Sequence, residues 1–447
     1  MSQPGPVSRF MGSPAFKFVL LGLLTLLLMI PMLMVYLVVD ERERYSRAAV
    51  SEVGRKWGLA QKISGPYLIV PQTRWVEKTD RAGVKTRSRE VQYVTLLPET
   101  LNVEVDVSAK ELKRGIYGVP VYESKFKYSG RFNALETEKL TRGSTELRFE
   151  DAAFVMLISD VRGIKETTSV QLGAQSVKFT AGNGFSAKRA AGIHVSLQEH
   201  NVKSGFEFSF ELPVNGTETL HFEPSGGETK LQMKSNWPHP SFIGNFLPSD
   251  RSISSKGFEA RWDVPQLARG QSQLHIRPGV EALMRHNLFG VQFYQPVGFY
   301  DLVGRALKYA IAFIAAAFLL VFVMEVYAGR PVHWIQYVFV GFALLIFYLV
   351  LLGLAEHIGF ELSFGLASFA TSALIGLYSM SALKSPKKGF VLGFILLLIY
   401  GLLYLLLRVE DYALLIGSLT AFFMLAIVMY ITRDVDWSGY RSPAQKE

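Results

Sequence analysis

Hydrophobic residues in this 447-residue chain gather into six long apolar runs. A helix that crosses a bilayer needs roughly 20 mostly apolar residues, and each run comes close to that length. One run lies near the N-terminus and the other five occupy the last third of the chain. The runs are Phe18–Val39, Tyr309–Tyr327, Ile335–Ala355, Leu362–Leu383, Phe390–Leu407 and Tyr412–Thr432. The pattern therefore predicts a membrane protein with six transmembrane helices.

The first run is longer than the apolar part of a cleaved signal peptide, and no small-residue cleavage site follows it. We therefore interpret it as an uncleaved signal anchor. Beyond it, acidic and basic residues are spaced four apart, as in Glu43 with Arg47 and Glu52 with Lys56. Such pairs stabilise an exposed helix. The helix is expected to continue as a stalk to about Gly58.

Between Pro66 and the second apolar run, the hydrophobic period changes from 3.6 to 2. Hydrophobic and polar residues alternate over 101–108, 122–128 and 206–212, which is typical of half-buried strands. The pair Asn215-Gly216 then predicts a hairpin turn. We expect a large β-rich domain, built as a β-sandwich or as two stacked β-subdomains.

Basic residues in the short flanks of the apolar runs indicate the orientation of the chain. They gather in the N-terminal tail, in alternate loops and in the C-terminal tail, whereas Arg408 alone lies in the short loops of the other side. Basic loops stay in the cytoplasm, so both termini are expected there and the large domain outside. The expected segments are a cytoplasmic tail (1–17), a signal anchor (18–39), an outer β-rich domain with its stalk helix (40–304), a five-helix bundle (305–432) and a cytoplasmic tail (433–447).

The amino-acid composition excludes several kinds of reaction and partner. The chain is 49% hydrophobic and 19% charged, and it has no cysteine, which excludes disulfides, thiolate nucleophiles and cysteine-ligated metals. The formal charge is +9, but lysines and arginines are interleaved with acids, so no compact basic face for nucleic acid is predicted. The mild basic surplus of the outer domain favours anionic partners such as lipid headgroups, or belongs to an ordinary solvated surface.

The signatures H-E-x-x-H, G-x-S-x-G, the P-loop, G-x-G-x-x-G and the EF-hand loop are all absent from the chain. We therefore expect no enzyme activity, no cofactor and no catalytic, cofactor-binding or metal-ligating residue. One alternative is an enzyme that pairs His239 with a carboxylate from elsewhere in the outer domain.

A few ionisable residues lie in or beside the predicted spans. Glu325 is near the inner end of its helix, and a structural anchor neutralised by Arg330 or Lys384 is favoured over a proton site. Glu356, His357 and Glu361 cluster at a membrane boundary. A polar loop at the outer surface is favoured there over a zinc site or a proton relay. Tyr337 is assigned to an aromatic belt at a membrane interface.

The stretch from Ser235 to Pro248 is both aromatic and rich in proline. Its prolines disfavour a helix or a central strand, and its aromatic residues are too apolar for a free loop. We expect an ordered loop anchored by its aromatics. It either caps the sheet or binds a partner or the membrane, and the candidate interaction residues are Trp237, Pro238, His239, Pro240, Phe242 and Phe246.

Four strings carry a resemblance to a known family. They are SNWPHPSFIGNFLP (Ser235–Pro248), GFEARW (Gly257–Trp262), RALKYAIAF (Arg305–Phe313) and LLGLAEHIGF (Leu351–Phe360). With the domain order, they resemble the CreD family of Gram-negative bacteria. The resemblance implies an inner-membrane address, a periplasmic outer domain and a part in envelope integrity, in tolerance to some colicins and in responses to β-lactams. It carries no catalytic residue with it.

The expected function is that of a non-enzymatic, multi-pass inner-membrane protein of envelope integrity and stress response. Its periplasmic domain is expected to bind an envelope protein or an anionic lipid. The helices are expected to lie in the lipid bilayer, and no nucleic acid is expected as a partner. The alternative is a transporter or flippase-like protein for an amphiphilic envelope substrate. That alternative needs a polar cavity among the spans, for which the candidates are Ser363, Thr371, Ser372, Ser379 and Ser418.

Overall fold

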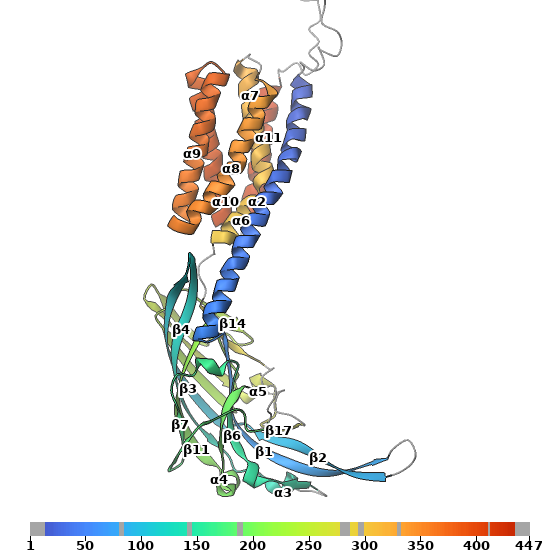
Figure 1. Ribbon diagram of the computed structural model, residues 1–447, viewed down its shortest axis with the longest axis vertical. Helices are drawn as coiled ribbons and strands as arrows, with labels where there is room; N and C mark the ends of the chain where they lie inside the picture. Colours follow the sequence, from blue (N-terminus) through green and yellow to red (C-terminus); the bar gives the residue numbers. More distant parts are fainter. Residues whose placement is uncertain are drawn as a thin grey trace, which may run out of the picture. The chain divides into compact units, whose positions relative to one another are not determined.

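The computed structural model describes residues 14–79, 85–140, 145–185, 191–277, 287–293, 299–328, 332–409 and 412–433. The chain divides into two compact units. The first combines residues 1–45 with 297–447 and is helical, and the second, residues 46–296, is built mainly from strands (Figure 1). The expected boundaries at 39/40 and 304/305 fall inside helices α2 and α6, respectively.

Helix α2 (Pro14–Trp57) runs without a break through the first apolar run and the predicted stalk. It contains Pro31 and ends before Gly58, whose positive φ of 135° is a conformation that side chains rarely adopt. A Cβ on Gly58 would also meet the carbonyl of Asn215. The stalk helix and its end at Gly58 are confirmed.

The remaining helices of the first unit follow one another closely. They are α6 (Phe299–Lys308), α7 (Ala310–Ala328), α8 (Trp334–Ile358), α9 (Phe360–Ala382), α10 (Pro386–Arg408) and α11 (Ala413–Thr432). In the described part of the chain, α2, α8, α9 and α10 are long and apolar enough to cross a membrane. The pair α6–α7, bent by 55°, makes a fifth crossing if it is counted as one span. A mixed protein of apolar helices and a β-rich domain is confirmed, whereas the count of six spans stays a prediction.

The described residues of the second unit form two sheets. One has ten strands in the order β14-β18-β12-β1-β6-β10-β9, with β2 and β5 on β1 and β17 on β2; the other has eight in the order β15-β16-β13-β3-β4-β11-β7-β8. The strands are β1 (Gln61–Thr79), β2 (Lys85–Leu96), β3 (Thr100–Arg114), β4 (Tyr117–Phe132), β5 (Thr145–Leu147), β6 (Ala153–Ile158), β7 (Ser169–Leu172), β8 (Gln175–Lys178), β9 (Thr180–Ala181), β10 (Gly192–Ser196), β11 (Phe206–Thr217), β12 (Thr219–Phe222), β13 (Glu228–Ser235), β14 (Pro240–Gly244), β15 (Asp250–Ser254), β16 (Gly257–Pro265), β17 (Leu274–Arg277) and β18 (Phe289–Phe293). Short helices α3 (Thr137–Leu140), α4 (Glu199–Ser204) and α5 (Gln266–Arg269) connect some of them.

One hydrophobic core joins the two sheets. Phe126 of β4, Phe154 of β6 and Phe289 of β18 are all fully buried in it. The ring of Phe154 lies 5.4 Å from that of Phe208, which belongs to the other sheet. The domain is therefore a β-sandwich with a shared core, and the alternating segments predicted as strands are confirmed in β3, β4 and β11.

The predicted hairpin turn at Asn215-Gly216 is wrong. Both residues lie inside β11, where Asn215 pairs with Glu123 and Gly216 with Tyr122 of β4. A Cβ on Gly216 would collide with the hydroxyl of Tyr122, so this glycine serves a close approach between strands. The chain leaves β11 at Glu218, which has a positive φ of 57°, and enters β12 of the ten-stranded sheet.

Candidate functional site

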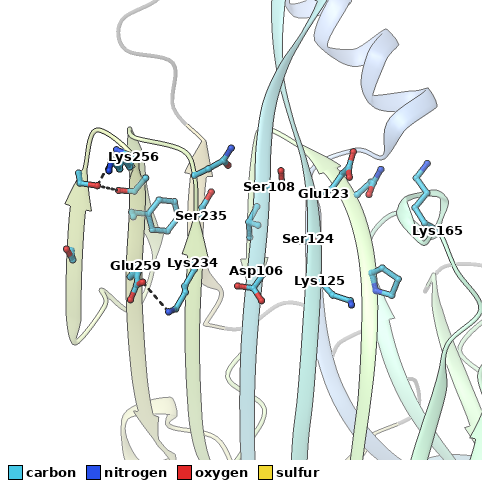
Figure 2. Close-up of a pocket in the computed structure, with 18 of the residues that line it drawn as sticks. Asp106, Ser108, Glu123, Ser124, Lys125, Lys165, Lys234, Ser235, Lys256 and Glu259 are labelled. Atoms are coloured by element: carbon cyan, nitrogen blue, oxygen red, sulfur yellow. Dashed lines mark hydrogen bonds and ion pairs between the residues drawn. The ribbon is translucent and has the colours of Figure 1, made fainter.

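A groove with a volume of about 1140 Å³ crosses the outer face of the eight-stranded sheet. Its lining residues come mainly from β15, β16, β13, β3, β4 and β11, which lie side by side in Figure 2. On β3, the buried Val105 and Val107 alternate with the exposed Asp106 and Ser108. Successive side chains of a strand point to opposite faces. Burial of one face in the core therefore turns the polar residues of each strand toward the groove.

A row of alternating charges runs across the middle of this groove. Strand register places Glu259 beside Lys234, Lys234 beside Asp106, and Asp106 beside Lys125. Figure 2 shows these four residues at one level across four strands. Nζ of Lys234 lies 3.2 Å from Oε1 of Glu259. Opposite charges on neighbouring strands attract each other, so the row also helps to hold the strand register.

The groove is lined by equal numbers of positive and negative side chains. The four lysines are Lys125, Lys165, Lys234 and Lys256, and the four acidic residues are Asp106, Glu123, Glu166 and Glu259. The basic surplus that the sequence suggested as an attraction for anionic partners is therefore not concentrated here. A surface of this kind selects a partner by the pattern of its charges rather than by its net charge.

The aromatic and proline-rich segment begins at one end of the groove. Asn236 lines the groove, and its side chain accepts a hydrogen bond from the backbone N–H of Ala109 at 2.7 Å and donates one to the Ala109 carbonyl at 3.0 Å. The expectation of a continuous loop is wrong in one part, because Pro240–Gly244 forms β14, which pairs with β18. β14 is an edge strand and Pro240 is its first residue, two positions in a sheet that tolerate proline.

The aromatic side chains of this segment face the core of the sandwich. The ring of Phe242 lies 5.7 Å from Trp262, that of Phe246 lies 6.1 Å from Phe289, and that of Trp237 packs edge-on against Phe293. Trp262 Nε1 donates a hydrogen bond to the Phe246 carbonyl at 3.2 Å. The aromatics thus anchor the segment, as predicted.

The other candidate residues of this segment are less buried. Pro238 and Pro240 are half-buried and His239 is exposed. Among the described residues, no hydrogen bond or ion pair joins His239 to a carboxylate. The contact that an enzyme based on His239 would need is therefore not formed in the described part of the domain. An interaction role for the six candidate residues stays a prediction.

A second polar cluster lies inside the β-sandwich unit, and no sequence pattern predicted it. Glu223 follows β12 and is 8% exposed, and Tyr67 of β1 donates a hydrogen bond to its Oε2 at 2.8 Å. Burial raises the pKa of Glu223 to about 7, opposed by the Tyr67 and Ser64 side chains and the charge of Arg269. Arg269 is itself buried, and its Nη1 donates to the Ser225 carbonyl at 2.8 Å.

In the helical unit, Glu325 of α7 is buried and has two partners among the described residues. Its Oε1 pairs with the ammonium of Lys17, and its Oε2 accepts a hydrogen bond from the hydroxyl of Tyr337 at 2.6 Å. The expected partners were Arg330, which lies outside the described residues, and Lys384, which is exposed and forms no described contact with Glu325. Lys17 takes the role because α2 already begins at Pro14.

Glu356, His357 and Glu361 do not form the expected polar loop. Glu356 and His357 belong to the last turn of α8, Glu361 belongs to the first turn of α9, and the single residue Gly359, with a φ of 80°, separates the helices. Residues with a side chain rarely adopt this φ, so a glycine is what allows a turn of a single residue between the two helices.

Each of the two carboxylates at this turn has its own partners. Glu356 accepts a hydrogen bond from the Tyr300 hydroxyl at 3.1 Å and lies 3.8 Å from Nε of Arg42, whereas Glu361 pairs with Arg408. His357 is exposed. Within the described ranges, no group of three or more histidine, aspartate and glutamate side chains is arranged to hold a metal ion.

Comparison with known proteins identifies the family. The family model described as "Inner membrane protein CreD" matches residues 13–438. The chain is also 31% identical, over 425 residues, to inner membrane protein CreD of Escherichia coli strain K12, which covers 94% of this chain and 93% of that protein. The chain belongs to the CreD family. The CreD-family match includes all four strings that suggested it, and it makes this chain an inner-membrane protein.

A solved structure was also found for this CreD-family chain. It is an M1 zinc metallopeptidase of Deinococcus radiodurans bound to a peptide substrate, 10% identical, with a TM-score of 0.20 over 44% of this chain and 42% of that one. So low a score carries no argument about the fold.

The serines and threonine proposed to line a transport path have different surroundings in the described part of this CreD-family protein. The hydroxyl of Ser363 donates to the Gly359 carbonyl at 2.6 Å, and that of Ser418 to the Leu415 carbonyl at 3.0 Å. The space beside Ser372, about 300 Å³, is lined by apolar residues and glycines of α9 and α10. Thr371 and Ser379 are buried in α9. The transporter alternative stays a prediction.

Proposed function

We propose that this CreD-family protein supports the integrity and stress response of the cell envelope by binding another envelope protein in the groove of its β-sandwich. The observation that supports the proposal is the row of alternating charges from Glu259 to Lys125 across that groove. The proposal includes the orientation taken from the sequence, with both termini in the cytoplasm, six spans and the sandwich in the periplasm. It requires no catalytic step.

Charge balance favours a protein over an anionic lipid as the partner. A negatively charged membrane surface attracts clusters of lysine and arginine, each worth about 1 kcal/mol near the surface. In this groove, both lysines of the row, Lys125 and Lys234, have a carboxylate beside them, which removes that advantage. A polypeptide can instead present both signs of charge at matching positions, together with backbone groups that bond to Ser235 or Ser252 of the lining.

The test exchanges one ion pair of the row. In the double variant Lys234→Glu/Glu259→Lys the ion pair between β13 and β16 is kept, the attraction between position 234 and Asp106 of β3 is lost, and the pattern presented to a partner is reversed. The matched control exchanges Arg261 and Asp263, which lie on β16 at 3.1 Å from each other and do not line the groove. Each variant is produced as the full chain in a strain that lacks its own CreD-family gene.

We expect the wild type and the control exchange to restore growth in the presence of a β-lactam, and the groove exchange to fail at equal protein level in the membrane. A photo-crosslinking residue at position 252 provides a direct readout, because Ser252 lines the groove. A discrete protein adduct should form in the wild type and be lost in the groove exchange. Full restoration of growth by the groove exchange, or an adduct that it leaves unchanged, would refute the proposal.

A further inference from the structure

A second cavity, in the helical unit, combines an apolar wall with one charged group. It has a volume of about 660 Å³ and lies between the first turns of α2 and the start of α8. Five leucines of α2 line it, namely Leu20, Leu21, Leu23, Leu24 and Leu27, together with Lys17. The exposed Trp334 of α8 also belongs to the lining. A cavity of this composition suits a hydrocarbon chain.

Lys17 is the charged group that this cavity presents. Both carboxylate oxygens of Glu325 are already engaged, one by Lys17 and the other by the Tyr337 hydroxyl. An ammonium has three donors. Among the described residues, Lys17 uses them on Glu325 and, at 3.4 Å, on the Val332 carbonyl, and its side chain remains 24% exposed. The Lys17 ammonium therefore has donor capacity left for a ligand, whereas the buried Glu325 carboxylate does not line the cavity.

We propose that this cavity binds a phospholipid with an anionic headgroup, with the lipid phosphate against Lys17 and an acyl chain along the leucines of α2. Lysine near the end of a membrane helix reaches for the interface, and tryptophan is enriched at the same level. Lys17 and Trp334 thus mark the height at which a headgroup lies. A zwitterionic ethanolamine headgroup also needs an acceptor for its ammonium, and the buried carboxylate of Glu325 does not line the cavity.

The composition of the wall favours a lipid over a helix of another protein. Helices that pack in a membrane approach each other over small residues such as glycine, alanine and serine. This chain uses that arrangement between α9 and α10, where a Cβ on Gly376 would lie 3.2 Å from Cα of Gly393. Bulky side chains such as Leu20, Leu24 and Trp334 line the present cavity instead. These bulky side chains leave a cavity that a flexible acyl chain fills more readily than a second helix does.

The experiment is native mass spectrometry of the full chain in detergent with equal amounts of added phosphatidylglycerol and phosphatidylethanolamine. The main variant is Lys17→Met/Glu325→Gln, which removes both charges together and leaves no buried carboxylate unpaired. Leu27→Trp places a larger side chain at an exposed position of the cavity lining and keeps the contacts between Lys17, Glu325 and Tyr337. Lys387→Met is the control, because Lys387 is an exposed lysine of α10 that does not line the cavity.

We expect the wild type to retain phosphatidylglycerol in preference to phosphatidylethanolamine. The amount retained should fall about fivefold or more in the charge-free double variant and in Leu27→Trp, and stay unchanged in Lys387→Met; a fivefold loss corresponds to about 1 kcal/mol. Equal retention of the two lipids by the wild type would overturn the proposal. So would undiminished phosphatidylglycerol binding in Leu27→Trp, which tests the site even if the double variant fails to fold.

Discussion

The hydroxyl of Tyr67 donates a hydrogen bond to Oε2 of Glu223 at 2.8 Å, joining two residues that are 156 positions apart in the chain. Both side chains are buried beside Arg269. Burial makes the charged form of this carboxyl group costly and raises its pKa to about 7, although Tyr67, Ser64 and Arg269 oppose the change. The stability of the β-sandwich must therefore depend on pH in a definite direction.

Glu223→Gln should remove a pH dependence. Because the folded pKa is above the ordinary value of 4.5, the folded state holds the proton more tightly than the unfolded state. The stabilisation is complete below pH 4.5 and is lost as pH rises through 7. The loss is at most about 3 kcal/mol. Urea unfolding of the full chain, followed by tryptophan fluorescence between pH 5 and 8, should show a slope in the wild type that the glutamine variant lacks. An identical slope in both proteins would contradict this account.

The ion pair between Lys17 and Glu325 predicts how a single variant compares with a double variant. Lys17→Met alone leaves the buried Glu325 without its cation and should destabilise the full chain by about 3 kcal/mol. Lys17→Met/Glu325→Gln removes both charges and should be more stable than that single variant. The measurement is the apparent melting temperature in detergent. A double variant that melts below Lys17→Met would show that the two side chains do not act as a pair.

The pattern of the sequence was sufficient for much of the fold. The alternation from Leu101 to Val107 predicts β3 because a strand has a period of two and one of its faces is buried. The same reasoning failed at Asn215-Gly216, where a glycine needed for the approach of Tyr122 has the same sequence signature as a turn. Local sequence does not distinguish a glycine that allows a turn from one that makes room for a neighbour.

The candidate sites were harder to predict because their partners are distant in sequence. Lys17 and Glu325 are 308 positions apart, and Tyr337 was assigned to a membrane interface although it is buried against Glu325. No local pattern relates such residues, since their contact depends on how whole helices pack. The alternating charges of the groove were visible strand by strand, but their alignment required the order of the strands.

Close packing of α9 on α10 predicts opposite results for two glycines of the same helix. A side chain at Gly376 would press against Gly393 and the Gly389 carbonyl, whereas Gly365 has nothing within 4 Å of the position of a Cβ. Gly376→Leu should lower the stability by about 1–3 kcal/mol through overpacking, and Gly365→Leu should not. Melting of the two full-length variants in detergent checks this. Equal melting temperatures would show that the helices do not approach as closely as the structure has them.

In the aromatic and proline-rich segment Ser235–Pro248, some side chains pack against the sandwich, whereas His239 lies on the surface. Phe242 packs against both Phe258 and Trp262, with ring centroids at 5.8 and 5.7 Å, whereas His239 is exposed. Phe242→Ala should therefore destabilise the sandwich by about 2 kcal/mol, less than the change at a fully buried phenylalanine, because Phe242 is half-buried. His239→Ala should leave the urea midpoint unchanged.

The same variant tests the proposed function. If His239→Ala remains fully folded but fails in the growth test with a β-lactam, the exposed surface of the segment takes part in binding. A folded His239→Ala variant with full activity would restrict the segment to its structural role.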